Sequence, residues 1–582
     1  MKPLHKPRHL AAVIILTVAA GSYGYLAMYD TRLDASQVRL ATVAMKDHAP
    51  SLYSHDPVFG DSDLWRGHAP LFLVAMKIVL APSGYGDLTL PFRVMSPVLT
   101  LVFLLGMYAL IYRQCLNWSV SVFIAILSTT VTSAPGQVSW GIGPVAMVTP
   151  TGVCLAVLPL LVIAFLRNWN YHKRPAREAR RGLWCLLVVF LCVGLLGNIE
   201  LGMSMNIALV LACVYLAGRR FALRAWPVAG ACLLVAAAAA SPQFAYVLSL
   251  RYSMLTKPPP TAPLIFEAFR QGGLRMMFPE LAGDMVDWML SCSLLIVISI
   301  AVLFRLDRLK ARNLGFWLVM FIASLTVTIV GQGLTQLSAA LTGRGPIIID
   351  FARAVPLAML PLYAFGAQTL ANLFRLSRRG HTLRWGCVAL TAIWMLPSDN
   401  LRVVRHWGYE VGTAFMDQQD KPLRIRKRMR RVQRRAELQN IARWARENTD
   451  VDDIFIADDA EFRMLSRRSM IAGDDVRWVF YLAPGYLPEW IERTGELRKM
   501  LRSSGGKADA EAIYLFAIDP QHVTIWRGAK NWYAVINSDA DPESDRFETI
   551  GGEGWGKHWR LVRIIRPETP AAATGVTIRA IP

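Results

Sequence analysis

Hydrophobic positions in the first two thirds of the chain form long runs rather than the spaced pattern of a soluble amphipathic helix. Many of these runs approach the roughly 20 residues that a helix needs to cross about 30 Å of hydrocarbon. We predict eleven membrane spans, near residues 10–28, 92–112, 117–133, 150–166, 183–199, 202–217, 226–243, 288–304, 314–331, 355–373 and 383–397. The predicted fold is mainly α, a polytopic transmembrane helical bundle over residues 1–397.

The pattern changes after residue 397, where apolar runs become short and polar residues separate them. Helical spacing predicts helices at 436–448 and 488–501, and short apolar runs predict strands at 454–457, 513–518, 533–536 and 561–565. Such alternation favours a small α/β domain over residues 436–582. The last strands are equally compatible with an antiparallel meander.

Charge orients the predicted spans. The connections at 167–182, 218–225, 305–313 and 374–382 are rich in Arg and Lys, as cytoplasmic loops usually are. The amino terminus is therefore predicted in the cytoplasm, and an odd number of spans places residues 398–582 on the exported side. Only 18% of residues are charged, against about 25% in soluble domains, so we predict a multi-pass protein of the cell inner membrane.

A basic run, 421–435, lies within the predicted linker 398–435 and holds nine Lys or Arg residues. A nucleic-acid surface is disfavoured, because no aromatic platform or groove-reading motif accompanies the run. A topology signal is a second reading, but the run begins more than twenty residues after the last span. We favour contact with anionic lipid headgroups, to which each basic residue near the surface contributes about 1 kcal/mol.

Acidic residues concentrate in the first predicted exported loop, 29–91. This loop holds seven of the fifteen acids that precede residue 398, between Asp30 and Asp87. Carboxylates gathered beside a membrane indicate a functional site, although a solvated loop remains the alternative. Asp30 directly follows the first span, and Asp34 is one helical turn further, so both are predicted on one helix face. The apolar segment Pro70–Leu80 is too short to span and is predicted to lie in the interface as a helix.

Metal and cofactor motifs give little support to other chemistries. Asp61 and Asp63, with His48, His55 and His68 nearby, permit a divalent metal, but capping of a helix before Leu64 is the favoured reading. The sequence contains no C-x-x-C pair, phosphate-binding P-loop, H-E-x-x-H helix or G-x-S-x-G elbow. No metal ligand is assigned and no cofactor is firmly implied.

The order of these elements, a first span, an acidic loop with an interfacial helix, many further spans and an exported carboxyl-terminal domain, resembles the GT-C class of membrane glycosyltransferases. The segments 441–449, 454–458, 462–463 and 467–468 also resemble the carboxyl-terminal region of bacterial proteins of this type. Asp30 matches the position of the family's one signature acid. The resemblance implies transfer of a hexosyl or pentosyl group from a polyprenyl-phosphate donor to an exported acceptor.

The same resemblance implies roles for particular residues. Asp30 would serve as catalytic base, supported by Asp34 or Asp56. Arg353 would stabilise the donor phosphate, with a snorkelling interfacial arginine as the alternative reading. Weaker substrate-binding candidates are Arg66, His55, Arg251 and Arg275.

Two further functions stay open at this stage. A non-catalytic relative could keep the scaffold for assembly, and a lipid or polysaccharide transporter would need polar residues within the spans. The one notable polar cluster there is Asn198, Glu200 and Asn206, at a turn between two predicted helices. The sequence names neither the sugar nor the acceptor.

Overall fold

The computed structural model describes most of residues 6–565. The residues outside the description are 1–5, 30–32, 61–63, 66, 130–131, 135–137, 144, 174, 254–279, 290–312, 343–349, 378–411, 414–415, 417–421, 474–486, 502–508, 520–527, 540–544 and 566–582. Described residues divide into two units. The helical unit comprises residues 1–40, 66–416 and 477–487, and the sheet unit comprises 41–65, 417–476 and 488–582.

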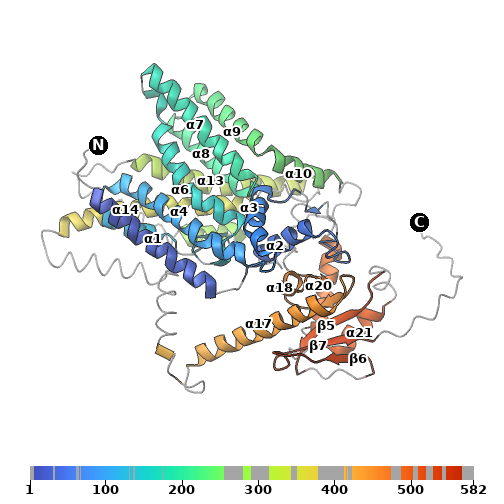
Figure 1. Ribbon diagram of the computed structural model, residues 1–582. Helices are drawn as coiled ribbons and strands as arrows, with labels where there is room; N and C mark the ends of the chain where they lie inside the picture. Colours follow the sequence, from blue (N-terminus) through green and yellow to red (C-terminus); the bar gives the residue numbers. More distant parts are fainter. Residues whose placement is uncertain are drawn as a thin grey trace. The chain divides into compact units, whose positions relative to one another are not determined.

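The helical unit is built from long apolar helices (Figure 1). Its α-helices are α1 (Lys6–Tyr29), the start of α2 (Ala35–His48), α3 (Pro70–Leu80), α4 (Leu90–Cys115), α5 (Trp118–Leu127), α6 (Pro150–Asn168), α7 (Ala176–Gly197), α8 (Leu201–Gly218), α9 (Trp226–Ala239), α10 (Ser241–Ser253), α13 (Leu314–Thr342) and α14 (Met359–Ser377). Short 3-10 helices are η2 (Ala81–Ser83), η4 (Val145–Met147), η5 (Tyr171–Lys173), η6 (Leu223–Ala225) and η8 (Phe351–Ala358). Strands β1 (Thr132–Ala134) and β2 (Val138–Trp140) form a small antiparallel hairpin.

Six helices among the described residues are long and apolar enough to cross a membrane, or seven if a bent pair counts as one span. They cover Leu90–Cys115, Pro150–Asn168, Ala176–Gly197, Leu201–Gly218, Gly315–Leu341 and Phe351–Asn372. This agrees with a multi-pass membrane protein. The predicted number of eleven stays a prediction, because the spans at 288–304 and 383–397 lie largely or wholly outside the described residues.

Two predicted spans differ from the structure in form. The one at 117–133 is helical only over Trp118–Leu127, and the chain then enters the β1–β2 hairpin. The one at 226–243 is broken at Ala240, where α9 and α10 meet at an angle of 69°. By contrast, the helix predicted at Pro70–Leu80 has the predicted bounds. Pro70 is the first residue of this helix. Proline has no backbone N–H, but at this position the N–H would have no hydrogen-bond partner within the helix, so the helix loses nothing.

Helix packing in this unit uses small residues where backbones approach closely. α7 packs against both α8 and α9. A Cβ atom added to Gly194 of α7 would lie 2.2 Å from the carbonyl oxygen of Ala236 in α9. Only glycine therefore permits this approach, as is common between membrane helices.

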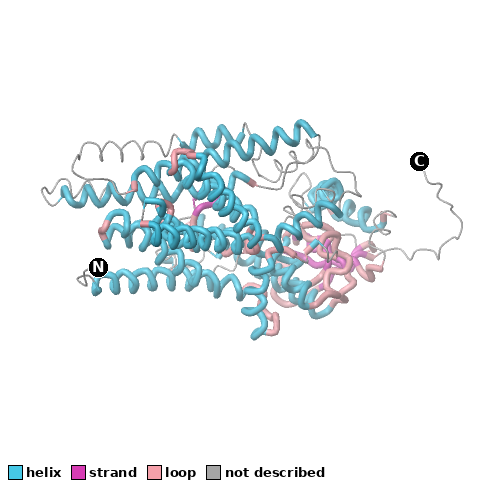
Figure 2. Tube along the Cα trace, turned by 90° about the horizontal axis from the view of Figure 1, so that it is seen from above, coloured by secondary structure: helices cyan, strands magenta, loops and turns pink. Residues whose placement is uncertain are grey.

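The sheet unit has three layers, with a five-stranded mixed sheet between helices. The strand order is β4-β3-β5-β7-β6, in which β3 is parallel to β4 and β5, and β7 is antiparallel to β5 and β6. The strands are β3 (Ile454–Ile456), β4 (Ser469–Met470), β5 (Trp532–Asn537), β6 (Phe547–Ile550) and β7 (Trp559–Ile564). The helices are α17 (Leu423–Asn448), α18 (Ala460–Ser466), α20 (Leu487–Leu501) and α21 (Ala510–Ile518). Figure 2 shows these strands among the helices.

Alternate residues of the central strands face opposite layers. Ile454 and Trp532 share a core with α20 and α21, whereas Phe455 and Tyr533 share one with α17 and α18. This is the period-two alternation of a strand buried on both faces. The mixed topology combines the α/β arrangement and the antiparallel meander that the sequence left open.

Most elements predicted in this region are confirmed, and one is wrong. Strands at 454–456, 532–537 and 559–564 and helices ending at Asn448 and Leu501 match the predictions. The segment 513–518, predicted as a strand, forms the last six of the nine residues of helix α21. The side chain of Asp509 caps this helix by accepting the N–H of Ala512. The basic run predicted as a linker is also helical over 423–435 and continues into 436–448 as one helix, α17.

Candidate functional site

The helical unit brings Arg353 together with two carboxylates that are distant in sequence. The Arg353 Nε donates to Asp350 Oδ2 at 3.2 Å, and its Nη1 donates to Glu200 Oε1 and, at 3.3 Å, to Thr151 Oγ1. The side chains of Arg353, Glu200 and Asp350 are 30%, 23% and 18% exposed. The predicted phosphate ligand therefore lies in a partly accessible ion-pair cluster, which we call the Arg353 cluster.

Helix starts position each member of this cluster. Asp350 caps η8, its side chain accepting the N–H of Ala352. Glu200 directly precedes α8, and Thr151 lies in the first turn of α6. The Asn206 side chain of α8 donates to the carbonyl of Asp350 at 2.9 Å. Glu200 and Asn206, noted from the sequence as part of one polar cluster, therefore contact Arg353 and Asp350, whereas Asn198 donates to the Ala239 carbonyl of α9.

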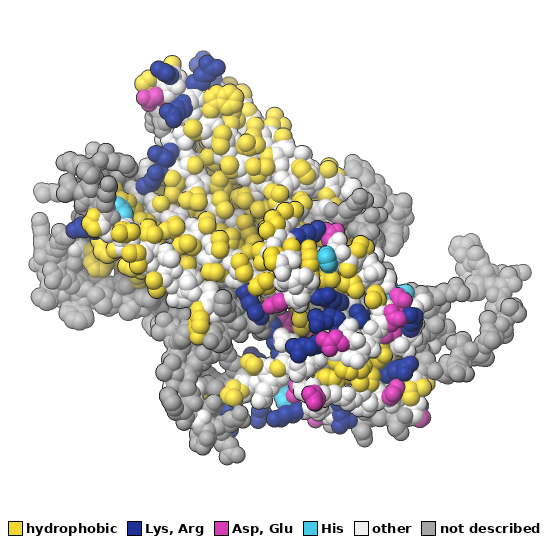
Figure 3. Space-filling model, viewed as in Figure 1, with side chains coloured by type: hydrophobic (Ala, Val, Ile, Leu, Met, Phe, Trp, Pro, Cys, Tyr) yellow, Lys and Arg dark blue, Asp and Glu magenta, His cyan; other side chains and the backbone are white. Residues whose placement is uncertain are grey.

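The Arg353 cluster lies at the end of α6, α7 and α8 opposite to their basic connections. These packed helices alternate in direction, as short connections require, so 149–151 and 198–201 share one end while Arg167, Arg177 and Arg219 belong to the other. The 18 residues of α8 separate the two ends by about 27 Å. Figure 3 shows Lys and Arg side chains gathered at the start of α7, beyond a largely hydrophobic surface.

Among the described residues, the cluster holds two carboxylates and one guanidinium. Both acids are partly hydrated, so neither is forced to pair as a fully buried acid would be. A phosphate competing for the guanidinium would displace a carboxylate, and a displaced carboxylate can accept a proton. The arrangement therefore places a cation within contact distance of two carboxylates that could accept a proton.

The sheet unit contains a second arginine–carboxylate pair, between Asp56 and Arg463. Arg463 Nε donates to Asp56 Oδ2 at 2.7 Å, and the two side chains are 1% and 0% exposed. The N–H groups of Val58 and Phe59 donate to Asp56 Oδ1, and that of Met470 donates to Oδ2. These contacts engage both carboxylate oxygens. Asp56 was predicted to support catalysis, and its surroundings favour a structural role.

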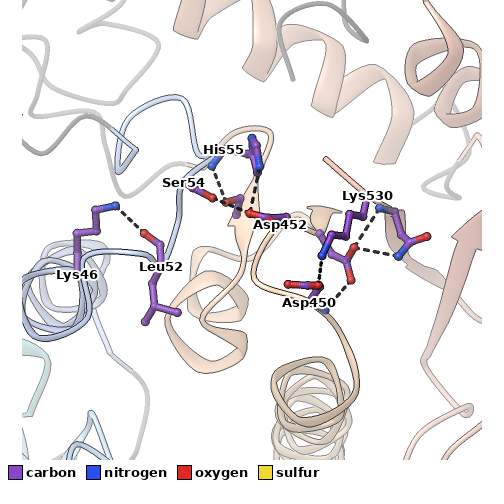
Figure 4. Close-up of polar contacts among 10 residues, drawn as sticks. Lys46, Leu52, Ser54, His55, Asp450, Asp452 and Lys530 are labelled. Atoms are coloured by element: carbon purple, nitrogen blue, oxygen red, sulfur yellow. Dashed lines mark hydrogen bonds and ion pairs between the residues drawn. The ribbon is translucent and has the colours of Figure 1, made fainter. Parts of the chain in front are cut away.

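His55 lies beside the acidic turn that precedes β3 (Figure 4). Its Nε2 is 3.4 Å from Asp452 Oδ1, to which the Ser54 hydroxyl also donates. Its backbone N–H donates to the hydroxyl of Ser469 at 3.2 Å. His55, predicted to bind substrate, therefore connects segment 41–65 to the turn before β3 and to β4.

The same turn contacts the residues preceding β5. Lys530 and Asp450 are paired, and their hydrogen bond lowers the pKa of Asp450 and raises that of Lys530. Asp453 Oδ1 accepts from the backbone and side chain of Asn531, both at 3.0 Å. The acids at 450–453 are thus engaged in loop-to-loop contacts (Figure 4).

Lys46 holds the start of segment 41–65. Its Nζ donates to the carbonyls of Pro50 and Leu52, both at 2.7 Å. Burial lowers the pKa of Lys46, and the nearby Asp56 carboxylate partly offsets this. The segment therefore has its own internal polar scaffold.

The remaining predicted site residues divide between different places. Asp30 and Arg66 lie outside the described residues, as do Asp61, Asp63 and Arg275. α1 ends at Tyr29 and α2 begins at Ala35, so Asp34 is not on a continuation of the first span, contrary to the shared helix face predicted for it. Its carboxylate instead accepts the backbone N–H of Ser36 at 3.1 Å, which starts a new helix.

The residues that the structure describes contain no group of three His, Cys, Asp or Glu side chains that could hold a metal ion. Because Asp61 and Asp63 lie outside them, the divalent metal considered from the sequence stays untested.

Comparison with known proteins adds no family assignment. No protein-family model matches the chain, and no curated protein matches it with significance. The functional interpretation therefore rests on the residues and their geometry.

Proposed function

We propose that this chain is an integral membrane glycosyltransferase that moves a sugar from a polyprenyl-phosphate donor to an acceptor on the exported side. Arg353 stabilises the phosphate as the sugar leaves, and a carboxylate at the same membrane surface accepts the proton of the acceptor hydroxyl. Asp30 remains the first candidate for that base because it directly follows α1.

The observation that carries the proposal is the Arg353 cluster. A charged residue inside a bundle of membrane helices is costly and usually marks function. This one is 30% exposed and lies at the less basic end of its helices. By the positive-inside rule that end would face the exported side, where a lipid-linked sugar would be presented.

The reaction balances with these groups alone. The acceptor oxygen attacks the anomeric carbon, the bond from that carbon to the phosphate oxygen breaks, and the lipid phosphate leaves with the electron pair. The carboxylate takes the hydroxyl proton. The guanidinium neutralises charge that grows on the phosphate, which is the kind of electrostatic stabilisation that most lowers a barrier.

Glu200 has two roles open to it within this proposal. It can hold Arg353 in position, or it can act as base when the phosphate takes its place on the guanidinium. Asp30→Asn distinguishes these roles, because a base at Glu200 would leave turnover in that variant unchanged.

The test is transfer of labelled sugar from polyprenyl-phosphate donors by the purified full chain in nanodiscs. Asp30→Asn should lower the rate by about 10²–10⁴-fold, the usual loss when general-base assistance is removed. Asp47→Asn is the matched control, since Asp47 is an exposed acid in the same predicted loop and outside the proposed site.

The alternatives have distinct results. Absence of transfer by the unaltered chain across a broad panel of donors would favour a non-catalytic scaffold. Movement of a labelled lipid-linked sugar across the bilayer without a new glycosidic bond would favour a transporter.

A further inference from the structure

Three arginines of α17 line one face of that helix. Arg426, Arg430 and Arg434 are spaced by four residues, so their side chains lie above one another. All three are exposed. Their shared face forms one wall of a groove in the sheet unit, with a cavity volume of about 640 Å³.

The opposite wall is formed where β5 ends and β7 begins. Asn537 is the last residue of β5 and is paired with Trp559, the first residue of β7. The groove is lined on this side by Asn537, Ser538, Asp539, Lys557 and His558. Because β5 is parallel to β3, its carboxyl end lies at the edge of the sheet where open α/β sheets usually bind ligands.

Contacts between the walls hold the groove in shape. The guanidinium of Arg434 lies over the Trp559 ring at 4.3 Å and donates to Asn537 Oδ1 at 3.2 Å. The Trp559 indole donates back to the Arg434 carbonyl at 3.0 Å. The backbone N–H of His558 donates to Glu437 Oε2 of α17 at 2.8 Å. A ligand would therefore meet a largely preformed site.

The charge of the groove is not balanced by its own walls. It is lined by three arginines, one lysine and a single carboxylate, Asp539. Among the described residues, no carboxylate lies within ion-pair distance of Arg426, Arg430 or Lys557. Arg435, which does not line the groove, is instead paired with Glu461. The described walls of the groove therefore carry a net positive charge, which favours an anionic ligand.

We propose that this groove binds a ligand carrying two or more negative charges on phosphate, either an anionic lipid headgroup or a soluble phosphate compound. Arginine side chains match phosphate oxygens in pairs, and three of them on one wall fit more than one such contact. The volume exceeds that of a single phosphate ion and suits a headgroup or a diphosphate. The site involves no residue assigned to sugar transfer.

The experiment measures phosphate binding by the full chain in phosphatidylcholine nanodiscs. Pyrophosphate binding is followed by calorimetry, and association with separate vesicles is compared with and without phosphatidylglycerol. The triple variant Arg426→Gln, Arg430→Gln, Lys557→Gln should weaken binding about 100-fold, at about 1 kcal/mol for each basic residue removed. Asp539→Asn should strengthen binding, because it removes the one repelling carboxylate.

A matched control removes three positive charges from residues of the same helix that lie outside the groove. Lys427, Arg431 and Arg443 are exposed residues of α17 that do not line it. Their triple substitution by Gln should change pyrophosphate binding less than threefold, the expected size for screened charges at this distance. Unchanged thermal unfolding in both triples would show that neither has lost its fold.

The outcomes separate the ligand sources and expose the proposal to failure. Binding of pyrophosphate alone identifies a soluble phosphate ligand, and binding of phosphatidylglycerol vesicles alone identifies a lipid headgroup. Equal losses in the two triple variants would overturn the proposal, since net charge rather than the groove would explain binding. Absence of binding in both assays would also overturn it.

Discussion

Each unit contains an arginine paired with carboxylate groups, but the two units bury these charged side chains to different extents. In the sheet unit, Asp56 and Arg463 are both buried, and three backbone N–H groups engage the carboxylate further. In the helical unit, Arg353 pairs with the carboxylates of Glu200 and Asp350, and all three side chains are partly exposed. The comparison teaches that exposure, more than ion pairing itself, separates an arginine that can meet a ligand from one that holds a fold.

The largest effect is expected from opening the buried pair. Asp56→Ala removes the buried carboxylate that accepts from Arg463 Nε, and it should destabilise the sheet unit by about 3–5 kcal/mol. Hydrogen–deuterium exchange of the full chain, read on peptides containing β3 and β4, measures this locally. Glu496→Ala is the control, because its pair with Lys499 is exposed and such pairs contribute about 0–1 kcal/mol. If β3 and β4 are as well protected from hydrogen–deuterium exchange in Asp56→Ala as in the unaltered chain, Asp56 does not have the structural role proposed for it.

The exposed cluster should respond in activity rather than in stability. Arg353→Ala should lower sugar transfer by about 10²–10³-fold, comparable to the loss of one donor to a developing oxyanion. Unfolding should change little, because Arg353 remains partly hydrated. Arg220→Ala, at the other end of the same helices, serves as the control in the transfer assay. If Arg353→Ala keeps full sugar-transfer activity, Arg353 serves only in packing at the ends of these helices.

The smallest of the predicted effects concerns His68, whose burial lowers its pKa and makes the stability of the chain depend on pH. Burial, with a contribution from the nearby Arg39 guanidinium, holds the pKa of His68 well below its ordinary value of 6.5. The folded chain then keeps His68 neutral, whereas the unfolded chain takes up a proton as the pH falls below about 6.5. This contribution to stability is present above that pH and is lost below it, by at most about 1.4 kcal/mol per pH unit.

His68→Gln removes the titrating group, so the difference in unfolding temperature between the two proteins should depend on pH only below about 6.5. His48→Gln is the control, because His48 is exposed. If the unfolding temperature of His68→Gln depends on pH in the same way as that of the unaltered chain, other groups cause the loss of stability in acid.

Periodicity and local signals predicted much of the secondary structure. The bounds of Pro70–Leu80 followed from an apolar run that begins at a proline. The strand predicted at 533–536 from a short apolar run lies within β5, Trp532–Asn537. The segment 513–518 was assigned wrongly because a short apolar run fits a buried strand and a buried helix equally well. Asp509 followed by Glu511 was the available helix-start signal.

The site was harder to predict because its contacts are distant in sequence. Arg353 was singled out from its place at the edge of a span, but Glu200 is 153 residues away and was assigned to a different feature. No local pattern carries that pairing. Similarly, Phe462 and Arg463 were noted only for a resemblance, and nothing near them in sequence indicates Asp56.

Interleaving of the sheet unit in the sequence has a consequence for biosynthesis. Asp56 leaves the ribosome 407 residues before Arg463, a delay of roughly 20–80 s at about 5–20 residues per second. During translation this acid must remain hydrated, and segment 41–65 must wait without the strands that will cover it. A gene fragment starting at residue 417 would encode Arg463 without Asp56, and the protein made from it would lack the buried pair that joins the two parts of this unit.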